Sequence, residues 1–241
     1  MEEIRNSPVQ TVVTSPPYWN LKDYKHPEQI GHGETYEKYH ERLNKVWAEC
    51  KRVLKPDGTL WIVVDKITFK GDVLNIPFDI VRNCKNIGFY LKDIVVWNKP
   101  TAISGMNPRN LVNKYESVLF FAKSKDDFKF RNLGEEAKTP DATLNRKLLT
   151  NLWRFPVKAG SIRKTPPHEA PFPEDLISRI ILVSTVEGDL VLDPFLGSGT
   201  TLKTALELCR KCVAYEINRE FADVIAERLN IQRLLDLWAF K

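Results

Sequence analysis

The stretch Val12-Val13-Thr14-Ser15-Pro16-Pro17-Tyr18 contains the end of an apolar run, which is followed by two prolines. The apolar run predicts a short buried strand over residues 9–14. Each proline lacks an amide hydrogen, fixes φ and forces the residue before it into extended geometry. We therefore expect a stiff turn whose carbonyls lie outside any helix or sheet ladder. A hydroxyl and a ring at such a turn can hold an amino group above a flat surface, although a plain corner with a core tyrosine has the same pattern.

Beyond this turn, strand and helix patterns alternate along the chain. Apolar residues at helical spacing predict helices from Tyr36 to Leu54, from Pro77 to Gly88, from Pro173 onward, and over 199–208 and 221–229. Continuous apolar runs predict strands over 59–65, 94–97, 118–121, 190–192 and 213–215, and Lys55-Pro56-Asp57-Gly58 predicts a turn. This alternation predicts an α/β fold with a mostly parallel sheet and helices on both faces.

Length and composition favour one soluble domain. The chain has 241 residues, of which 43% are hydrophobic, and we expect a single domain over 1–241 with a polar insertion at 124–150. No apolar run is long enough to span a bilayer, and the charged N-terminus does not resemble a secretory signal, so we expect a cytoplasmic protein with no membrane partner. The formal net charge of +5 suits a polyanionic partner without requiring one.

The cysteines do not predict a metal site. Cys209 and Cys212 form one C-x-x-C pair, but neither a second pair nor a nearby histidine completes a zinc set. We interpret both residues as structural.

A second decisive stretch, Asp193-Pro194-Phe195-Leu196-Gly197-Ser198-Gly199-Thr200-Thr201, joins a predicted buried strand to a helix. Ligands of open α/β sheets bind outside the carboxyl ends of the strands. Glycines let the backbone approach a ligand, and a helix N-terminus offers amide hydrogens to a carboxylate. Asp193 can meet a positive amino group, and Glu216, at the end of the next strand, can accept both hydroxyls of a ribose.

These features favour S-adenosylmethionine, which has an amino group, a carboxylate and a ribose. A dinucleotide fingerprint would need a small residue in place of Leu202, and a P-loop would need a Gly-Lys-Ser/Thr sequence that the stretch lacks. A tight strand–helix turn that binds no ligand is the alternative.

Taken together, these stretches resemble the DNA methyltransferases that methylate amino groups at cytosine N4 or adenine N6. The order, with the catalytic motif before the cofactor motif, is similar to the circularly ordered beta group. Two further segments strengthen the resemblance: Leu54-Lys55-Pro56-Asp57-Gly58-Thr59-Leu60 looks like the family's helix–turn–strand link, and His168-Glu169-Ala170-Pro171-Phe172-Pro173 looks like its "H-x-A-x-F-P" segment. The resemblance implies a Rossmann-like methyltransferase fold, S-adenosyl-L-methionine as cofactor and double-stranded DNA as substrate.

The resemblance also implies roles for individual residues. The catalytic residues would be Ser15, Pro16, Pro17 and Tyr18, and direct transfer would need no covalent intermediate and no metal. The cofactor-binding residues would be Asp193, Pro194, Phe195, Gly197, Ser198, Gly199, Thr200, Thr201, Glu216, His168, Pro171 and Phe172.

Serine at position 15 favours cytosine N4 as the methylated atom, because family members with aspartate there mostly act on adenine. The resemblance thus implies a site-specific enzyme of a restriction–modification system, with a cognate restriction endonuclease as a possible partner and a monomer or homodimer as its state. The alternatives are an adenine-N6 methyltransferase, a methyltransferase acting on RNA or protein amines, and an inert nucleic-acid-binding or cofactor-sensing module of the same fold.

Basic residues around the expected cleft are candidates for DNA contacts, although solvated surface lysines are the commoner explanation. They are Lys99, Arg109, Lys114, Lys129, Arg131, Arg146 and Lys147, and segment 124–150 occupies the place of the family's target-recognition region. Trp19 and His26 could close over the target base or be plain loop residues.

One departure from the family pattern concerns the cofactor adenine. Family members usually begin with a strand ending in Gly-Asp and a helix, and that aspartate contacts the adenine. Here only a few residues precede Val12. The sheet would then be one strand short, a partner would cover its edge, or the start of this sequence is late, and no residue is assigned to the adenine.

Overall fold

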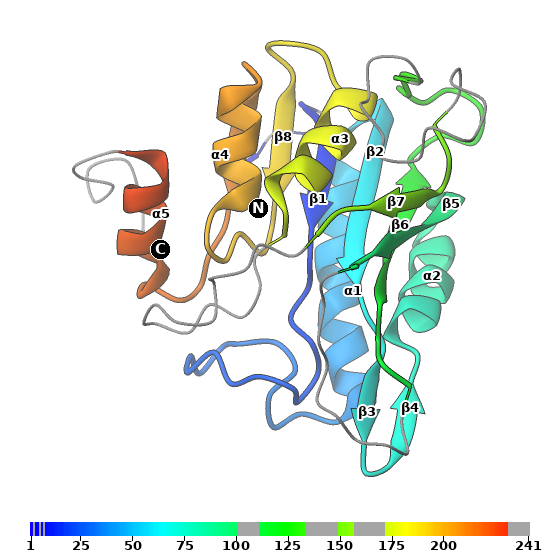
Figure 1. Ribbon diagram of the computed structural model, residues 1–241, viewed down its shortest axis with the longest axis vertical. Coiled ribbons are helices and arrows are strands. Elements are labelled where there is room, and N and C mark those ends of the chain that lie inside the picture. Colours follow the sequence, from blue (N-terminus) through cyan, green and yellow to red (C-terminus); the bar gives the residue numbers. More distant parts are fainter. Residues whose placement is uncertain are drawn as a thin grey trace.

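The fold is a three-layer α/β sandwich (Figure 1). The computed structural model describes residues 1, 3, 4, 6, 8–100, 111–133, 149–156 and 172–230. Within these ranges a seven-stranded sheet has the order β7-β5-β6-β2-β1-β8-β9. Its strands are β1 (Val9–Thr14), β2 (Leu54–Val64), β5 (Tyr90–Asn98), β6 (Tyr115–Ala122), β7 (Leu152–Arg154), β8 (Leu190–Asp193) and β9 (Lys211–Ala214). Beside it lies a short hairpin of β3 (Ile67–Phe69) and β4 (Asp72–Leu74).

The sheet is mostly parallel, as predicted. Strand β6 runs antiparallel to both of its neighbours, β2 and β5, and the other described pairs of the sheet are parallel. Because β1, β2, β5, β8 and β9 point the same way, the loops that follow them meet at one edge of the sheet. We call this the carboxyl edge.

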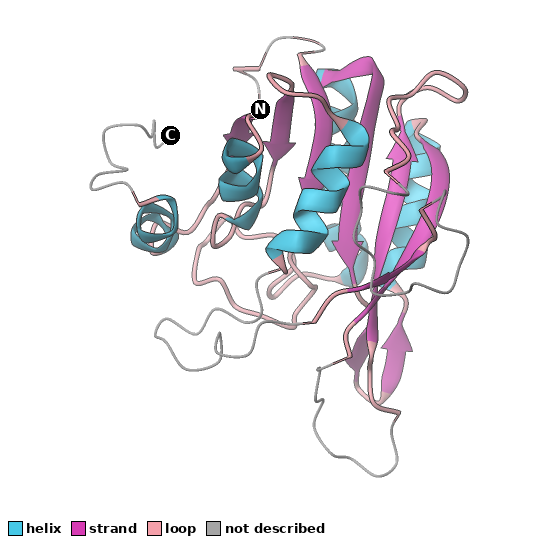
Figure 2. Ribbon diagram, turned by 45° about the horizontal axis from the view of Figure 1, so that its top comes forward, coloured by secondary structure: helices cyan, strands magenta, loops and turns pink. Residues whose placement is uncertain are grey.

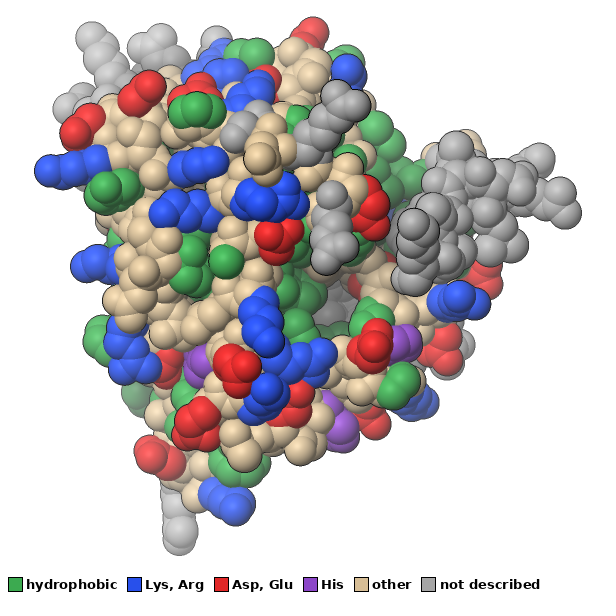
Figure 3. All heavy atoms as spheres, turned by 180° about the vertical axis from the view of Figure 1, so that it is seen from behind, with side chains coloured by type: hydrophobic (Ala, Val, Ile, Leu, Met, Phe, Trp, Pro, Cys, Tyr) green, Lys and Arg blue, Asp and Glu red, His purple; other side chains and the backbone are tan. Residues whose placement is uncertain are grey.

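Helices cover both faces of the sheet (Figure 2). On one face α1 (Tyr36–Val53) and α2 (Ile76–Ile87) bury a core that includes Leu43, Trp47 and Ile80. On the other face α3 (Glu174–Ser184) and α4 (Thr200–Glu207) bury a second core, and α5 (Phe221–Leu229) packs beside α4. Figure 3 views the molecule from behind, on the α1 and α2 side, where Lys and Arg are interspersed with Asp and Glu. None of the helices in the described ranges is long and apolar enough to cross a membrane.

The helix boundaries follow from local sequence signals. Helix α1 begins after Thr35, whose hydroxyl accepts a hydrogen bond from the Lys38 amide. Helix α2 begins after Asn75 with a proline in its first turn and ends at Gly88, whose φ of 95° is left-handed. The predicted helices and strands are all present, and their predicted ends differ from the observed ones by a few residues.

One prediction about local structure was wrong, and three short strands were not predicted. Residues 55–58 were predicted as a turn but belong to β2, where they form an irregular stretch: Val9 pairs with Leu54 while Thr11 already pairs with Thr59. The carbonyl of Gly58 accepts a hydrogen bond from the Lys123 amide at 3.0 Å, so this stretch is held from the opposite side as well. The β3–β4 hairpin and β7 were missed because each strand has only three residues.

The start of the predicted insertion belongs to the body of the domain. Leu133 is buried in the second core, and the Arg131 amide donates a hydrogen bond to the carbonyl of Val183 at 2.7 Å. Residues 134–148 of the same segment lie outside the described residues.

Strand β9 is the outer strand of the sheet in the described part of the chain. The first residues of the chain lie nearby: the Tyr215 hydroxyl donates a hydrogen bond to Glu3, and Arg52 on α1 donates to the carbonyls of Met1 and Ile4. Within the described residues, β9 therefore has no further strand beside it.

Candidate functional site

The two decisive stretches lie side by side at the carboxyl edge. Strands β1 and β8 are neighbours in the sheet, with Val12 paired to Leu192, so the turns that follow them emerge together. The Thr14 hydroxyl donates a hydrogen bond of 2.7 Å to the Asp193 carboxylate. A single contact thus joins residues 179 positions apart in the sequence.

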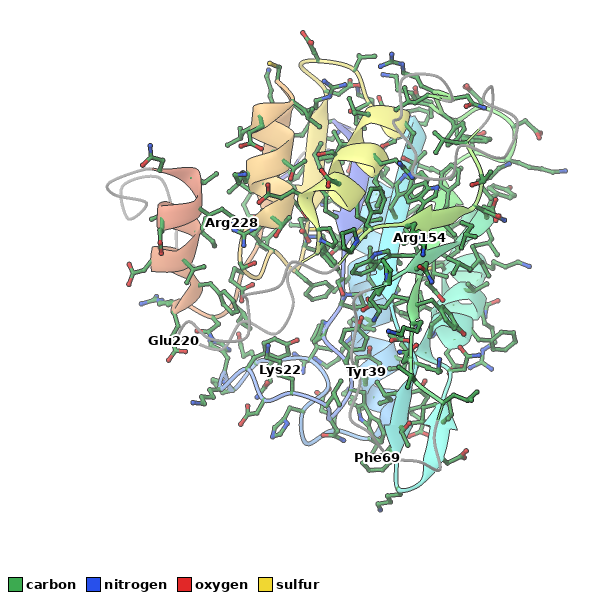
Figure 4. All side chains as sticks on the ribbon, in the orientation of Figure 1. Lys22, Tyr39, Phe69, Arg154, Glu220 and Arg228 are labelled. Atoms are coloured by element: carbon green, nitrogen blue, oxygen red, sulfur yellow. The ribbon has the colours of Figure 1, made fainter. Side chains whose placement is uncertain are left out.

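The Ser15–Tyr18 turn is anchored from below. The Tyr39 hydroxyl on α1 donates a hydrogen bond to the Pro17 carbonyl at 2.8 Å, and the Leu21 amide donates to the Tyr18 carbonyl at 3.2 Å. Tyr39 is shown at the carboxyl edge in Figure 4. The Pro17 carbonyl thus already has a hydrogen-bond partner within the protein.

Tyr18 is partly buried, with its hydroxyl among polar side chains. Burial, together with the negative charges of Glu116 and Asp65, raises the pKa of Tyr18 well above its ordinary value, and a hydrogen bond from Ser15 opposes the shift. Tyr18 is therefore a neutral phenol over the whole physiological pH range.

Trp19 is a core residue rather than a lid. Its indole ring packs against Tyr36 and Phe69 at centroid distances of 5.2 Å and 4.7 Å, and its Nε1–H donates to the Glu34 carbonyl at 2.8 Å. His26 lies in the same loop, where its Nδ1 accepts a hydrogen bond from the Glu28 amide. The possibility that Trp19 closes over a base is thus removed by its packing.

Asp193 is a buried carboxylate without a cation beside it in the described residues. Only 2% of its surface is exposed, and it accepts hydrogen bonds from Thr14 and from the Phe195 amide at 3.0 Å. Burial raises its pKa to about 6, although these hydrogen bonds oppose the shift. A buried acid of this kind favours a ligand with a positive group.

Glu216 holds the glycine loop in place. One of its carboxylate oxygens accepts a hydrogen bond from the Gly197 amide at 2.6 Å, and the other accepts from the Asn218 amide at 2.9 Å. Burial raises the pKa of Glu216, and these amides oppose the shift. Each oxygen keeps a lone pair, so Glu216 can also accept the hydroxyls of a ribose.

The start of α4 is shaped by a glycine and an arginine. Gly199 has a φ of 86°, and a Cβ at this position would lie 3.1 Å from the Ile225 side chain on α5. Arg228 reaches from α5 toward α4 and donates a hydrogen bond of 2.7 Å to the Thr200 hydroxyl (Figure 4). The N-terminus of α4 is thus flanked by a guanidinium group, which adds to its attraction for a carboxylate.

The other expected cofactor residues lie on or near the same loop. Phe195 packs edge-on against Trp47, Thr201 is buried in α4, and Phe172 is packed against the second core. Pro194 and Ser198 belong to the loop itself. His168 and Pro171 lie outside the described residues.

The four described basic residues that were expected to contact DNA do not form one group. Lys129 forms an ion pair of 2.8 Å with Asp189, directly before β8, and Arg131 bonds through its amide to the end of α3. Both therefore lie at the edge of the sheet opposite to Ser15. This position does not suit a contact with DNA bound at the Ser15–Tyr18 turn. Lys114 is exposed at the carboxyl edge. Arg109, Arg146 and Lys147 lie outside the described residues.

Lys99 lies at the carboxyl edge but is not available to a phosphate. Its side chain is 11% exposed and forms an ion pair of 2.7 Å with Glu116. Glu116 and Asp65 were not singled out from the sequence, and Thr14 was named only as part of the stretch that ends at Tyr18. The available signal was that Asp65 and Thr14 stand at the ends of buried parallel strands, where polar residues are placed for ligands.

Comparisons with known proteins identify the family. A family model described as DNA methylase, for N6 and N4 methyltransferases, matches residues 9–228. The type II methyltransferase M.Cfr9I of Citrobacter freundii is 31% identical, over 95% of this chain and 84% of its own length. M.MjaI of Methanocaldococcus jannaschii is 32% identical, over 97% of this chain and 89% of its own length.

Solved structures show the same fold. A putative DNA modification methylase of Thermus thermophilus, TTHA0409, in complex with S-adenosyl-L-methionine, has a TM-score of 0.66 and 31% identity, covering 95% of this chain and 89% of that one. The PvuII DNA methyltransferase (cytosine-N4-specific) has a TM-score of 0.76 at 20% identity, covering 98% and 84%, and shows the fold alone. The chain belongs to the N6/N4 amino DNA methyltransferase family, with S-adenosylmethionine as its methyl donor.

Proposed function

We propose that this protein methylates the exocyclic N4 amine of cytosine in duplex DNA, as the modification enzyme of a type II restriction–modification system. The observation that carries the proposal is the Thr14–Asp193 hydrogen bond, which sets a Ser-Pro-Pro-Tyr turn directly beside a cofactor loop. Relatives named as type II methyltransferases support the restriction–modification context. Serine at position 15 supports cytosine over adenine.

The described residues fit S-adenosylmethionine. Its positive amino group would be neutralised by Asp193, whose pKa is raised by burial. Its carboxylate would meet the amides at the start of α4 near Arg228, and its ribose would meet Glu216. When bound, this cofactor supplies an electrophilic methyl group on a sulfonium.

The protein's own task is to present the amine. An exocyclic amine is a weak nucleophile because its lone pair is delocalised into the ring, and it lies inside the duplex, so the base must be flipped out. The Ser15 hydroxyl and the Pro16 carbonyl would accept its two hydrogens and favour a pyramidal nitrogen. Tyr18 would stack on the flipped base, an interaction of roughly 1–3 kcal/mol that offsets part of the cost of flipping.

Catalysis then rests on position. The stiff proline turn holds both acceptors still, and Tyr39 fixes the turn from below, so the amine can be aligned with the methyl group for in-line attack. Within the proposal, one domain over 1–241 carries both sites. The undescribed part of 124–150 contributes to target recognition, and a cognate endonuclease and a monomer or homodimer are further expectations.

The identity of the methylated base is tested by product analysis. Purified protein is incubated with unmethylated genomic DNA and S-adenosylmethionine carrying an isotope-labelled methyl group, and the nucleosides are identified by mass spectrometry. Labelled N4-methylcytosine is the expected product. N6-methyladenine alone would replace the cytosine assignment by the adenine alternative, which shares the same amine chemistry, and no labelled nucleoside on any DNA would favour an inert module.

A further inference from the structure

Arg179, on α3, is a buried cation in contact with two aromatic rings. Only 8% of its surface is exposed. The guanidinium carbon lies 4.5 Å from the centroid of the Phe155 ring and 5.3 Å from that of the Trp153 ring, and both rings belong to the second core. Such contacts favour a guanidinium group, which is planar and more weakly hydrated than an ammonium group. We call Arg179, Trp153 and Phe155 the arginine–aromatic cluster.

The two rings leave the hydrogen-bonding capacity of Arg179 unused. A guanidinium group carries five N–H donors, yet no hydrogen bond or ion pair joins Arg179 to another residue in the described part of the chain. Asp175, one turn earlier on α3, is exposed and acts on Arg179 through its charge alone. Burial lowers the pKa of Arg179 and the Asp175 charge opposes this shift, but an arginine in a protein stays protonated. Arg179 is thus a buried positive charge with unused donors.

A second buried arginine, Arg210, shows the usual arrangement. It is 6% exposed, and it donates hydrogen bonds to the Thr185 hydroxyl at 2.9 Å, to the Thr185 carbonyl at 3.1 Å and to the Leu208 carbonyl. Because removing a charged group from water is costly, a buried arginine that serves stability is normally paired in this way. The unused donors of Arg179 therefore point to a ligand.

The guanidinium group of Arg179 lies toward the carboxyl edge and within reach of solvent. Helix α3 leads into the start of β8 at the opposite edge, so its N-terminus, toward which a long helical side chain leans, is directed to the carboxyl edge. The Phe155 amide donates a hydrogen bond of 3.2 Å to the carbonyl of Asn98, the last residue of β5. In the described part of the chain, the polar atoms that are fully enclosed and lack a partner include none of Arg179. A ligand at the carboxyl edge can therefore approach its donors.

The cluster lies on the side of the Ser15–Tyr18 turn that is opposite to the cofactor loop. Strand β1, which leads into the turn, has β8 with the cofactor loop on one side and β2 on the other. Trp61 of β2 stacks beside Trp153 of β7 at a centroid distance of 6.1 Å. The aromatic surface thus extends from the outer strand β7 to the neighbour of β1. Arg179 adjoins the half of the carboxyl edge where the substrate, and not the cofactor, would bind.

We propose that Arg179 binds a backbone phosphate of the target DNA, with Trp153 and Phe155 holding its guanidinium group in place. Duplex DNA presents closely spaced phosphates, and the planar fork of an arginine can bind a phosphate through two parallel hydrogen bonds. Because the rings restrict the side chain before binding, little conformational entropy is lost when the phosphate arrives. The phosphate satisfies the unused donors and neutralises the buried charge.

This inference rests on the proposed function, because it takes duplex DNA as the substrate. Its test measures DNA binding in the absence of S-adenosylmethionine and requires no methyl transfer. A wild-type protein that binds duplex DNA but yields no labelled nucleoside contradicts the proposed function alone. A wild-type protein that binds no duplex DNA contradicts the inference as well.

The experiment compares Arg179→Met with Arg210→Met. Each variant removes one positive charge and keeps an unbranched side chain, so effects of net charge are matched. Fluorescence anisotropy with a fluorescein-labelled DNA duplex gives the Kd between about 50 and 200 mM salt. We expect Arg179→Met to weaken binding by about tenfold or more and to lower the slope of log Kd against log salt concentration by about one. Arg210→Met should change neither, and an Arg179→Met protein with the wild-type Kd and slope would overturn the proposal.

Thermal unfolding distinguishes a binding role of Arg179 from a structural one. Arg179→Met should keep or raise the wild-type melting temperature, because it removes a buried charge without a partner. Arg210→Met should lower the melting temperature, because Thr185 loses its donors. If Arg179→Met does not fold, Arg179→Lys keeps the charge without the planar fork, and it should bind DNA more weakly with the wild-type salt slope. Failure of both Arg179 variants to fold would overturn the proposal in favour of a structural role.

Isothermal titration calorimetry tests the other anion near this edge, the carboxylate of S-adenosylmethionine. Arg179→Met should bind S-adenosylmethionine with the wild-type Kd, because the cofactor loop lies on the other side of the turn. A loss of cofactor affinity with unchanged DNA binding would assign Arg179 to the cofactor and overturn the proposal.

Discussion

At the scale of single residues, the site depends on polar groups that are buried before any ligand arrives. Asp193 accepts hydrogen bonds from Thr14 and Phe195, yet its pKa of about 6 shows that these bonds do not compensate for the loss of water. The carboxylate is therefore better explained by the cation that it is expected to bind than by the stability of the apoprotein.

The pH dependence of stability follows from this raised pKa. Between its ordinary value of 3.8 and about 6, Asp193 binds a proton more tightly in the folded protein than in the unfolded chain. Its contribution to stability is therefore present at low pH and is lost as pH rises to about 6, by at most about 3 kcal/mol.

Asp193→Asn keeps the acceptor oxygen and removes this titration. We expect its apoprotein to lack the decline between about pH 4 and pH 6 and to equal or exceed the wild type in stability at neutral pH, as measured by urea unfolding. The exposed Asp126→Asn is the control and should follow the wild type. The explanation fails if the wild type and Asp193→Asn share one pH profile.

Substitutions in the Ser15–Tyr18 turn and in the Asp193 loop should affect different steps, methyl transfer in the first and cofactor binding in the second. Ser15→Ala and Tyr18→Ala remove groups that we propose to contact the base, so we expect loss of methyl transfer with the affinity for S-adenosylmethionine unchanged. Asp193→Ala removes a charge-assisted contact and should weaken cofactor binding by about tenfold or more. Isothermal titration calorimetry with each variant distinguishes the two groups. Normal cofactor binding by Asp193→Ala would remove Asp193 from the cofactor site.

At the scale of elements, α5 is part of the cofactor loop's support. Ile225 packs against Gly199 and Arg228 bonds to Thr200, so both sides of the loop's last turn are held by one helix. Glycine suits position 199 for two reasons: the φ there is left-handed, and there is little space for a Cβ beside Ile225.

Gly199→Ala and Gly188→Ala form a matched pair. Both glycines have a left-handed φ, of 86° and 80°, but a Cβ on Gly188 would meet nothing within 4 Å. Both alanine variants should lose roughly 1 kcal/mol of stability through backbone strain. Only Gly199→Ala should also lose cofactor affinity, because its new Cβ would lie 3.1 Å from the Ile225 side chain and push the loop away from α5. Thermal unfolding and cofactor titration measure the two effects, and equal cofactor affinities in the pair would show that the Ile225 contact is irrelevant.

The sequence was informative wherever one local signal determined the structure. Proline pairs, glycine caps and continuous apolar runs predicted β1, α2 and the alternation of the main sheet, and the two motifs marked the stretches that lie side by side at the carboxyl edge. It was uninformative where partners are distant in the chain. Lys99 and Glu116 are 17 residues apart and form an ion pair because β5 and β6 are antiparallel neighbours in the sheet. Nothing in the sequence indicated that Lys129 forms an ion pair with Asp189, which lies 60 residues further along the chain.

At the scale of the whole molecule, the order of the strands in the sheet, and not their order in the sequence, decides which segments are neighbours. The catalytic turn precedes the cofactor loop in the sequence by nearly the length of the domain, yet β1 and β8 are adjacent. In the described residues the sheet ends at β9, and the contacts of Arg52 and Tyr215 keep the first residues close to that outer strand. Within the proposed function, the methyl donor and the target base would therefore bind side by side at the ends of two adjacent strands.

We expect the Thr14–Asp193 hydrogen bond to make the two proposed binding events thermodynamically dependent on each other. A non-reactive analogue of S-adenosylmethionine should tighten the binding of DNA containing the recognition site, and that DNA should tighten the analogue by the same factor, since such a cycle is reciprocal. We expect a factor of about five or more, measured by fluorescence anisotropy for DNA and calorimetry for the analogue. In Thr14→Val the factor should approach one while both ligands still bind alone, and an unchanged factor would mean that occupancy is communicated by another route. In an enzyme with this coupling, the affinity for the target DNA would depend on whether the methyl donor is already bound.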